Sequence, residues 1–95
     1  MVRIEVHFLS ILSDLSNVEN DIIEIQENST IRQVIDLLRN KIGIQFQKRI
    51  LSESNDLNNY VILVINGKDI RVLNGLNTII RDNDIISFLP ALAGG

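Results

Sequence analysis

Apolar and polar residues alternate at the beginning of the chain. Even positions are apolar and odd positions are charged or histidine, with Val2, Ile4, Val6 and Phe8 set against Arg3, Glu5 and His7. Successive side chains of a β-strand point to opposite faces, so this period of two predicts a strand with one buried face. Residues 10–20 contain many Ser, Asp and Asn residues and predict a loop, after which residues 22–25 return as the second strand of a hairpin.

The hydrophobic period changes to that of an α-helix after residue 30. Thr30 and Gln33 have the spacing of a capping box, with Ser29 as a rival N-cap, and Gly43 stands where a left-handed helix stop is expected. Between them the apolar positions form one stripe, made of Ile31, Val34, Ile35, Leu38 and Ile42. A stripe of this kind predicts one main helix that packs one side on a sheet.

Short strands joined by turns are predicted for the second half of the chain. Residues 60–65 form an apolar run, and the pair Asn66-Gly67 predicts a tight turn into a short return strand at residues 69–72. Residues 85–89 form the last strand. Pro90 ends it, because proline has no N–H for the hydrogen-bond ladder.

The two strands at residues 60–65 and 85–89 are apolar on both faces apart from Ser87, which is more than one helix can cover. Two explanations are open. Residues 44–59, which suggest a helical turn at 45–51 and an exposed loop at 52–59, fold over the second face, or that face stays apolar to receive a partner. Alternation predicts which side chains point inward and which outward: Leu63, Ile65, Ile86 and Phe88 inward, and Ile62, Val64 and Leu89 outward.

Length and composition narrow the possible functions. The 95 residues predict one domain, and the 45% of apolar residues suffice for a packed core. The net charge is −3 with no basic stripe, which disfavours nucleic-acid binding. The chain has no cysteine, so it offers neither a disulfide nor a thiol nucleophile. It shows no signal-peptide pattern and no apolar run that could cross a bilayer, and we expect a cytoplasmic protein.

The end of the chain carries the clearest chemical signal. We expect residues 1–90 to form the domain and residues 91–95 to form a flexible tail that ends in Gly94-Gly95. Two glycines leave no side chain beside the terminal carboxylate, so the backbone can pass through a narrow channel. The carboxylate is ionised at neutral pH and is a poor acyl electrophile. Adenylation by ATP would supply a leaving group, which sulfide or an amine could displace.

Several segments resemble the ubiquitin-like sulfur carriers, a group that includes the small subunit of molybdopterin synthase, the archaeal small modifier proteins and the ubiquitin-related modifiers. They are the turn Ile65-Asn66-Gly67-Lys68, the turn Asp82-Asn83-Asp84 and the ending Pro90-Ala91-Leu92-Ala93-Gly94-Gly95. The resemblance covers nearly the whole chain. Asn83 replaces the usual Gly and tolerates the same left-handed conformation. Ala91 stands where the molybdopterin subunit commonly has a second proline, so roles in tRNA thiolation and protein conjugation stay open.

The resemblance implies an α+β protein of the β-grasp fold, a mixed sheet of four to five strands with one main helix packed on one face. It implies that Gly95 is activated by a ubiquitin-activating-like adenylyltransferase that uses ATP. A thiocarboxylate would follow, its sulfur going to a synthase subunit or a tRNA-thiolating enzyme. The alternative is a protein modifier joined through Gly95 to target lysines, with the proteasome as a further partner. A third possibility is a β-grasp interaction module whose glycines play no part.

Other residues offer weaker signals, and we expect a carrier with no catalytic residue, metal or bound cofactor of its own. His7 lies on the polar face of the first strand and has no companion nucleophile. Asp82 and Asp84 fit turn chemistry better than a metal site. The lysines, Lys41, Lys48 and Lys68, would accept another tail only if conjugation occurs. The expected partner-binding residues are Ile62, Val64, Leu89, Leu92 and Ala93.

Overall fold

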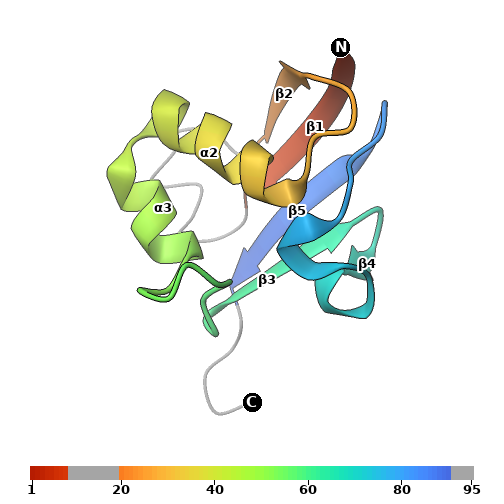
Figure 1. Ribbon diagram of the computed structural model, residues 1–95. Coiled ribbons are helices and arrows are strands. Elements are labelled where there is room, and N and C mark those ends of the chain that lie inside the picture. The colour runs from red at the N-terminus through yellow and green to blue at the C-terminus, as the bar shows by residue number, and fades with distance from the viewer. Residues whose placement is uncertain (9–19, 91–95) are drawn as a thin grey trace.

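The computed structural model describes residues 1–8 and 20–90, in which two α-helices cover one face of a five-stranded sheet (Figure 1). Two short 3-10 helices, η1 and η2, lie between the last strands. In chain order the elements are β1 (Val2–Phe8), β2 (Asn20–Ile25), α2 (Ile31–Ile42), α3 (Ile44–Ile50), β3 (Val61–Ile65), β4 (Lys68–Asp69), η1 (Ile70–Val72), η2 (Gly75–Asn77) and β5 (Ile85–Pro90).

The sheet is mixed, and its last strand lies in the middle. The strand order is β2-β1-β5-β3-β4, with β5 parallel to β1 and antiparallel to β3. The hairpin expected at the start of the chain is present, since β1 and β2 pair antiparallel from Val2 opposite Ile25 to His7 opposite Asn20. The prediction of an α+β protein with a mixed sheet is therefore confirmed.

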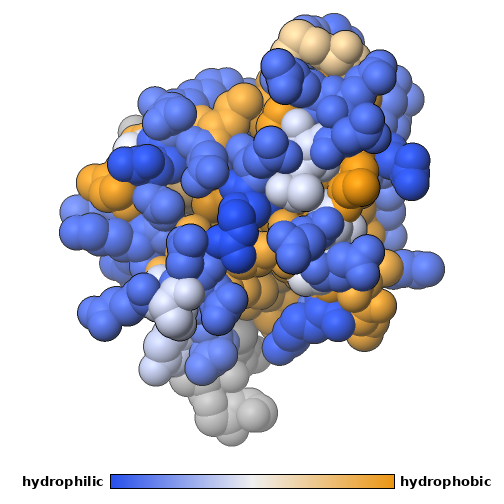
Figure 2. Space-filling view, in the orientation of Figure 1, coloured by the Kyte–Doolittle hydropathy of each residue, from blue (hydrophilic) through white to orange (hydrophobic). Residues whose placement is uncertain are grey.

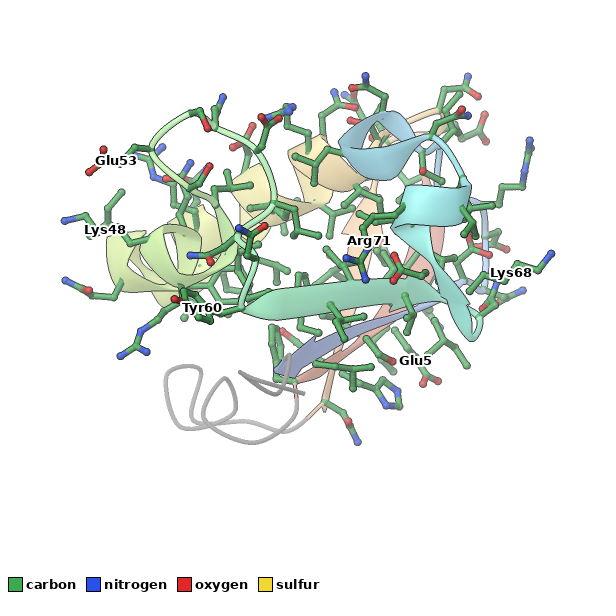
Figure 3. The ribbon with its side chains drawn as sticks, turned by 90° about the horizontal axis from the view of Figure 1, so that it is seen from below. Glu5, Lys48, Glu53, Tyr60, Lys68 and Arg71 are labelled. Atoms are coloured by element: carbon green, nitrogen blue, oxygen red, sulfur yellow. The ribbon has the colours of Figure 1, made fainter. Side chains whose placement is uncertain are left out.

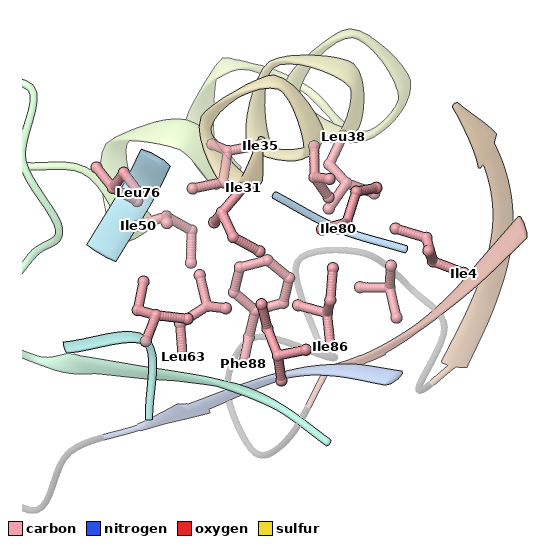
Figure 4. Packing of buried hydrophobic residues seen from close by; sticks show 14 of the residues in the cluster. Ile4, Ile31, Ile35, Leu38, Ile50, Leu63, Leu76, Ile80, Ile86 and Phe88 are labelled. Atoms are coloured by element: carbon pink, nitrogen blue, oxygen red, sulfur yellow. The ribbon is translucent and has the colours of Figure 1, made fainter. Parts of the chain in front are cut away.

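The inner face of the sheet and the apolar stripe of α2 form one core (Figure 4). Every inward residue predicted on the two apolar strands is buried, and so is the whole of the helix stripe except Ile42, which packs partly buried at its edge. On β1 the alternation holds as well, because Ile4, Val6 and Phe8 are buried between exposed or half-buried polar neighbours.

The helix α3 packs on the same face as α2, so the idea that residues 44–59 cover the second face is wrong. Phe46 of α3 is fully buried and makes edge-on contacts with Phe8 and Phe88, at ring-centroid distances of 5.6 and 5.5 Å. Phe8 and Phe88 stack on each other at 5.5 Å on the inner face. The loop after α3 stays on this side too, because the Arg32 guanidinium of α2 donates to the Asn55 carbonyl at 2.8 Å.

Local hydrogen bonds explain where α2 begins and ends. The Thr30 amide donates to Gln33 Oε1 at 2.8 Å, and the Gln33 amide donates to Thr30 Oγ1 at 3.4 Å, so the predicted capping box is present. Gly43 has φ 130° and ψ 169°, a conformation that favours glycine but is not left-handed helical as we expected. Its N–H still closes the helix by donating to the Arg39 carbonyl at 2.8 Å.

The return strand expected at residues 69–72 is much shorter. Only Lys68 and Asp69 pair with β3, and the chain then turns into η1. The Asp69 carboxylate causes this turn, since it accepts from the Arg71 amide at 2.9 Å and pairs with the Arg71 guanidinium at 2.6 Å. The turn before the last strand is as expected, with Asn83 at φ 69°.

Removing the buried ring of α3 tests the aromatic cluster. Phe46→Ala should lower the free energy of unfolding by about 3–5 kcal/mol, because it leaves a cavity against two other rings. Ile44→Ala, on the same helix at a position 46% exposed, should change it by no more than about 0.5 kcal/mol. Urea denaturation measures both, and equal losses would mean that α3 does not depend on this contact.

The ion pair between Asp69 and Arg71 predicts a pH dependence. The hydrogen bonds from Arg71 lower the pKa of Asp69 below its ordinary value. A lowered folded pKa stabilises the protein above the unfolded pKa, and this stabilisation is lost as the pH falls through the folded pKa. Asp69→Asn keeps a capping oxygen and removes the charge. It should therefore be less stable than the parent at pH 7, and in an acid denaturation series the difference should shrink as the pH falls below 3.8, the ordinary pKa of an aspartate.

Candidate functional site

The candidate site is the end of β5, from which residues 91–95 continue. This end of β5 contacts three elements. Leu89 and Pro90 lie opposite Ile62 and Val61 of β3. The Phe88 ring packs against Phe8 of β1 and Phe46 of α3. The strand extends one residue further than expected, to Pro90. The Asn66 N–H donates to the Ile85 carbonyl at 2.8 Å, and hydrogen-bonded pairs alternate along an antiparallel ladder, so the pair of Val61 and Pro90 falls where no N–H of residue 90 is needed toward β3.

The predicted tail residues lie outside the described part of the chain. Gly94 and Gly95, the expected site of activation, and Leu92 and Ala93, two of the expected partner-binding residues, belong to residues 91–95. Their roles, and the division of the chain after residue 90, stay predictions. What the structure describes is the base from which this segment begins.

The outward residues of β3 and β5 lie where alternation predicted them. Ile62 lies opposite Leu89 and Val64 lies opposite Ser87, and all four are half-buried on the face of the sheet away from the helices. We call this the outer face. It includes two apolar residues that sequence reasoning missed, Ile22 and Ile85, which lie on either side of Glu5. Only the pairing of β1 with both β2 and β5 shows that these two residues lie beside Glu5.

Polar side chains on the outer face pair with each other. His7 Nε2 lies 3.0 Å from Glu5 Oε2, and Arg3 Nη2 lies 3.4 Å from Glu24 Oε1. His7 is thus a surface residue with a carboxylate neighbour. Within residues 1–8 and 20–90 no three His, Cys, Asp or Glu residues gather as a metal site.

The aspartates of the turn before β5 act as hydrogen-bond acceptors. Asp82 Oδ1 accepts from the Arg3 amide at 2.8 Å, which ties the turn to β1. Asp84 accepts from the Arg81 amide at 2.7 Å and from Asn66 Nδ2 at 2.9 Å, which ties it to the β3–β4 turn. Their expected role in turn geometry is confirmed.

On the helix side of the tail base, hydrogen bonds of Asn58 connect α3 and β3. The Asn58 amide donates to the Ile50 carbonyl at 2.7 Å, and the Tyr60 amide donates to Asn58 Oδ1 at 3.0 Å, so the end of α3 and the start of β3 are joined. An open surface hollow of about 340 Å³ lies between the start of β3 and the two 3-10 helices, with Asn58, Val61, Ile70 and Leu76 in its lining. The view in Figure 2 is largely hydrophilic, with hydrophobic residues exposed in separate spots.

The three lysines have different surroundings. Lys41 Nζ pairs with Asp21 Oδ2 at 2.6 Å. Lys48 on α3 and Lys68 at the start of β4 are exposed and form no ion pair with any described residue. No helix among the described residues is long and apolar enough to span a membrane.

Comparison with known proteins covers almost the whole chain. The ThiS family model matches residues 6–95. A protein of Archaeoglobus fulgidus, provisionally named a sulfur carrier protein, is 35% identical over 69 residues, which are 73% of this chain and 77% of that protein. The sulfur carrier protein CysO of Mycobacterium tuberculosis is 37% identical over 62 residues, which are 65% of this chain and 67% of its own length.

Solved structures show the same arrangement. A chain of the BexX/CysO complex of Amycolatopsis orientalis is 25% identical with a TM-score of 0.77, over 97% of this chain and 99% of that one. The small archaeal modifier protein 1 of Methanosarcina acetivorans is 24% identical with a TM-score of 0.83, over 100% of this chain and 98% of that one. The second likeness supports the fold alone, and the expected β-grasp fold is confirmed.

Proposed function

The chain belongs to the ThiS family, and on this premise we propose that it carries sulfur as a thiocarboxylate at Gly95. The observation that carries the proposal is the family match itself, which runs to residue 95 and so includes both final glycines. The relatives named as sulfur carriers support it. Because those relatives are carriers, the expectation of a carrier instead of an enzyme agrees with the family.

The proposed reaction has two steps, both catalysed by an adenylyltransferase. A carboxylate oxygen of Gly95 attacks the α-phosphorus of ATP, and the bond to pyrophosphate breaks, so pyrophosphate leaves and an acyl adenylate forms. Hydrosulfide then attacks the carbonyl carbon and the bond to the AMP oxygen breaks. AMP leaves with that electron pair, and the new thiocarboxylic acid loses its proton. ATP is a substrate of the enzyme and not a cofactor of the carrier.

The geometry at the end of β5 suits such a substrate. Five residues follow Pro90, and fully extended they would reach at most about 17 Å. That distance allows the terminus to enter the active site of another protein while the domain stays outside. Glycine at the last two positions leaves no side chain to obstruct the reacting carbon.

We further propose that the outer face receives the enzyme that accepts the sulfur. CysO of A. orientalis occurs in a complex with BexX, and this chain, which resembles it, would likewise dock on a partner protein. The apolar residues Ile62, Val64 and Leu89 would make the contact, with Leu92 and Ala93 continuing it along the tail. The acceptor would be a subunit of a cofactor synthase, as in molybdopterin formation, or a tRNA-thiolating enzyme.

Protein modification is the second candidate, because it uses the same adenylate. In that reaction a lysine amine attacks the carbonyl carbon in place of hydrosulfide, and AMP leaves as before. The resemblance of the fold to an archaeal modifier protein motivates this alternative. A plain β-grasp interaction module would need neither step.

The intact mass of the untagged protein, purified from its own cells without thiols, tests the proposal. We expect a species in which one sulfur replaces one oxygen, and fragmentation should locate it at Gly95. The same spectrum establishes whether Gly95 is the terminus in the cell. Incubation with the adenylyltransferase, ATP and sulfide should raise the fraction of this species, whereas a variant without Gly95 should give none.

Other outcomes favour the other candidates. Adducts joined through Gly95 to lysines would favour the modifier, and they need a suitable search. Because no Lys or Arg follows Arg81, trypsin would leave residues 82–95 on the modified lysine in place of the usual Gly-Gly remnant. Absence of both products in the reconstituted reaction would contradict activation at Gly95, and unchanged partner binding without Gly95 would indicate an interaction module.

A further inference from the structure

Residues 78–80, between η2 and the turn before β5, run as an extended segment of which only one edge is paired. Thr30 and Ile79 form an isolated antiparallel bridge. Their neighbours exchange the hydrogen bonds, one of which runs from the Ile80 amide to the Ser29 carbonyl at 2.9 Å. In this pattern the N–H and C=O of the bridging residue itself point away from the partner. Those of Ile79 therefore face the other edge, where they bond to no described residue.

An open hollow of about 420 Å³ adjoins this segment. We call it the Ile79 hollow, and its lining includes Ile65, Lys68, Leu73, Ile79 and Arg81. Residues of β3 and β4 line it and none of residues 29–31 does, so it lies on the unpaired side of the segment. Leu73 and Ile79 are 39% and 46% exposed, so the hollow offers apolar contacts together with the unpaired backbone groups.

Two cations border the Ile79 hollow. Lys68 and Arg81 are exposed, and neither forms an ion pair with any residue that the structure describes. Asp84 also lines the hollow, but both of its carboxylate oxygens already accept hydrogen bonds, Oδ1 from Asn66 Nδ2 at 2.9 Å and Oδ2 from the Arg81 amide at 2.7 Å. The two cations therefore remain available to carboxylates from outside.

The Ile79 hollow lies at the end of the sheet remote from the tail base. Ile65 lies opposite Ile86, next to the start of β5, whereas Pro90 is five residues beyond Ile85, about 17 Å along the strand. Figure 3 shows Lys68 at one end of the molecule and Lys48 and Tyr60 toward the other. A partner in the hollow need not touch the tail or an enzyme that holds it.

From these observations we propose that the Ile79 hollow binds an extended segment of a partner protein, in which apolar residues are flanked by carboxylates. The segment adds as a short strand to the unpaired edge, so that its backbone accepts from the Ile79 N–H and donates to the Ile79 carbonyl. One of its apolar side chains enters the hollow beside Leu73, and its carboxylates lie against Lys68 and Arg81.

An extended acidic peptide is the occupant that uses every feature of the site. A small anion would pair with the cations and leave the apolar lining and the backbone groups of Ile79 unused. An apolar peptide without carboxylates would leave Lys68 and Arg81 without partners. The inference goes beyond the proposed function, because such a partner can hold the protein while Gly95 is in the active site of another protein.

Selection of short random peptides from a displayed library, on the immobilised full-length protein, tests the inference. The enriched sequences should share alternating apolar residues flanked by Asp or Glu. One enriched peptide is then synthesised and titrated into isotope-labelled protein. It should shift the amide resonances of Lys68 and Ile79 saturably, and it should slow the exchange of the Ile79 amide with water, because that N–H becomes hydrogen-bonded.

Single charge reversals provide the matched comparison. Lys68→Glu and Arg81→Glu should each raise the Kd of the selected peptide about fivefold, because an attraction becomes a repulsion. Lys48→Glu changes the net charge equally at the far end and should alter the Kd by less than about twofold.

A proline tests the role of the backbone edge. Ile79→Pro removes the N–H that the added strand needs and leaves the hydrogen bonds to residues 29–31 in place, since none of them uses this N–H. Thr78 is already extended, with φ −62° and ψ 129°, as a residue before proline prefers. The Kd should rise about tenfold. Thermal melting checks the fold, and Ile79→Ala, which keeps the N–H, should bind more tightly than Ile79→Pro.

Several results would overturn the inference. They are the absence of any enriched peptide, enriched peptides without carboxylates, shifts on the outer face in place of Ile79, and equal effects of Lys68→Glu and Lys48→Glu. If the same resonances shift with protein concentration alone, the hollow belongs to a second copy of the chain and the peptide inference is wrong. None of these measurements depends on Gly95, so their failure leaves the proposed function unaffected.

Discussion

The contact of Phe88 with Phe8 and Phe46 holds together the parts of the molecule that matter for function. Phe88 is on the central strand, Phe8 is on the parallel strand beside it, and Phe46 brings α3 onto both. The three rings lie near the carboxyl end of β5. The same packing that closes the core therefore fixes the point from which the tail begins. A central strand with partners on both sides gives that point more support than an edge strand would.

Elements specified by neighbouring residues were predictable from the sequence. The period of two on β1, the apolar stripe of α2 and the capping box at Thr30 depend on residues only a few positions apart. The role of α3 depends instead on Phe46 meeting Phe8 and Phe88, which are distant in the sequence. The shortening of β4 had a local cause that strand propensity hides, since the Asp69 side chain competes with the ladder for the Arg71 amide.

The same contrast between local and long-range information applies to the residues of the candidate site. Ile62, Val64 and Leu89 could be assigned to the outer face because alternation fixes the direction of each side chain once the inner set is known. The same rule would have put Ile85 outward, since Ile86 was in the inner set, but the place of Ile22 and Ile85 on either side of Glu5 follows only from the pairing of three strands. The exposure of Tyr60 could not be predicted, because in the sequence it belongs to the continuous apolar run of residues 60–65. The strand begins one residue later, at Val61, whose N–H is taken by the Asn58 carbonyl.

Under the proposed function, the tail has to meet an activating enzyme first and a sulfur acceptor afterwards. A single carboxyl terminus can occupy only one active site at a time, so a carrier has to leave its activating enzyme before it reaches its acceptor. Tight binding to either would slow this release, because differences in affinity between related complexes reside mainly in the dissociation rate. The half-buried apolar strip of Ile62, Val64 and Leu89 on the outer face is small, and under the proposed function it would suit a transient contact. The aromatic cluster fixes the tail base independently of any partner, because its three rings lie in the buried core.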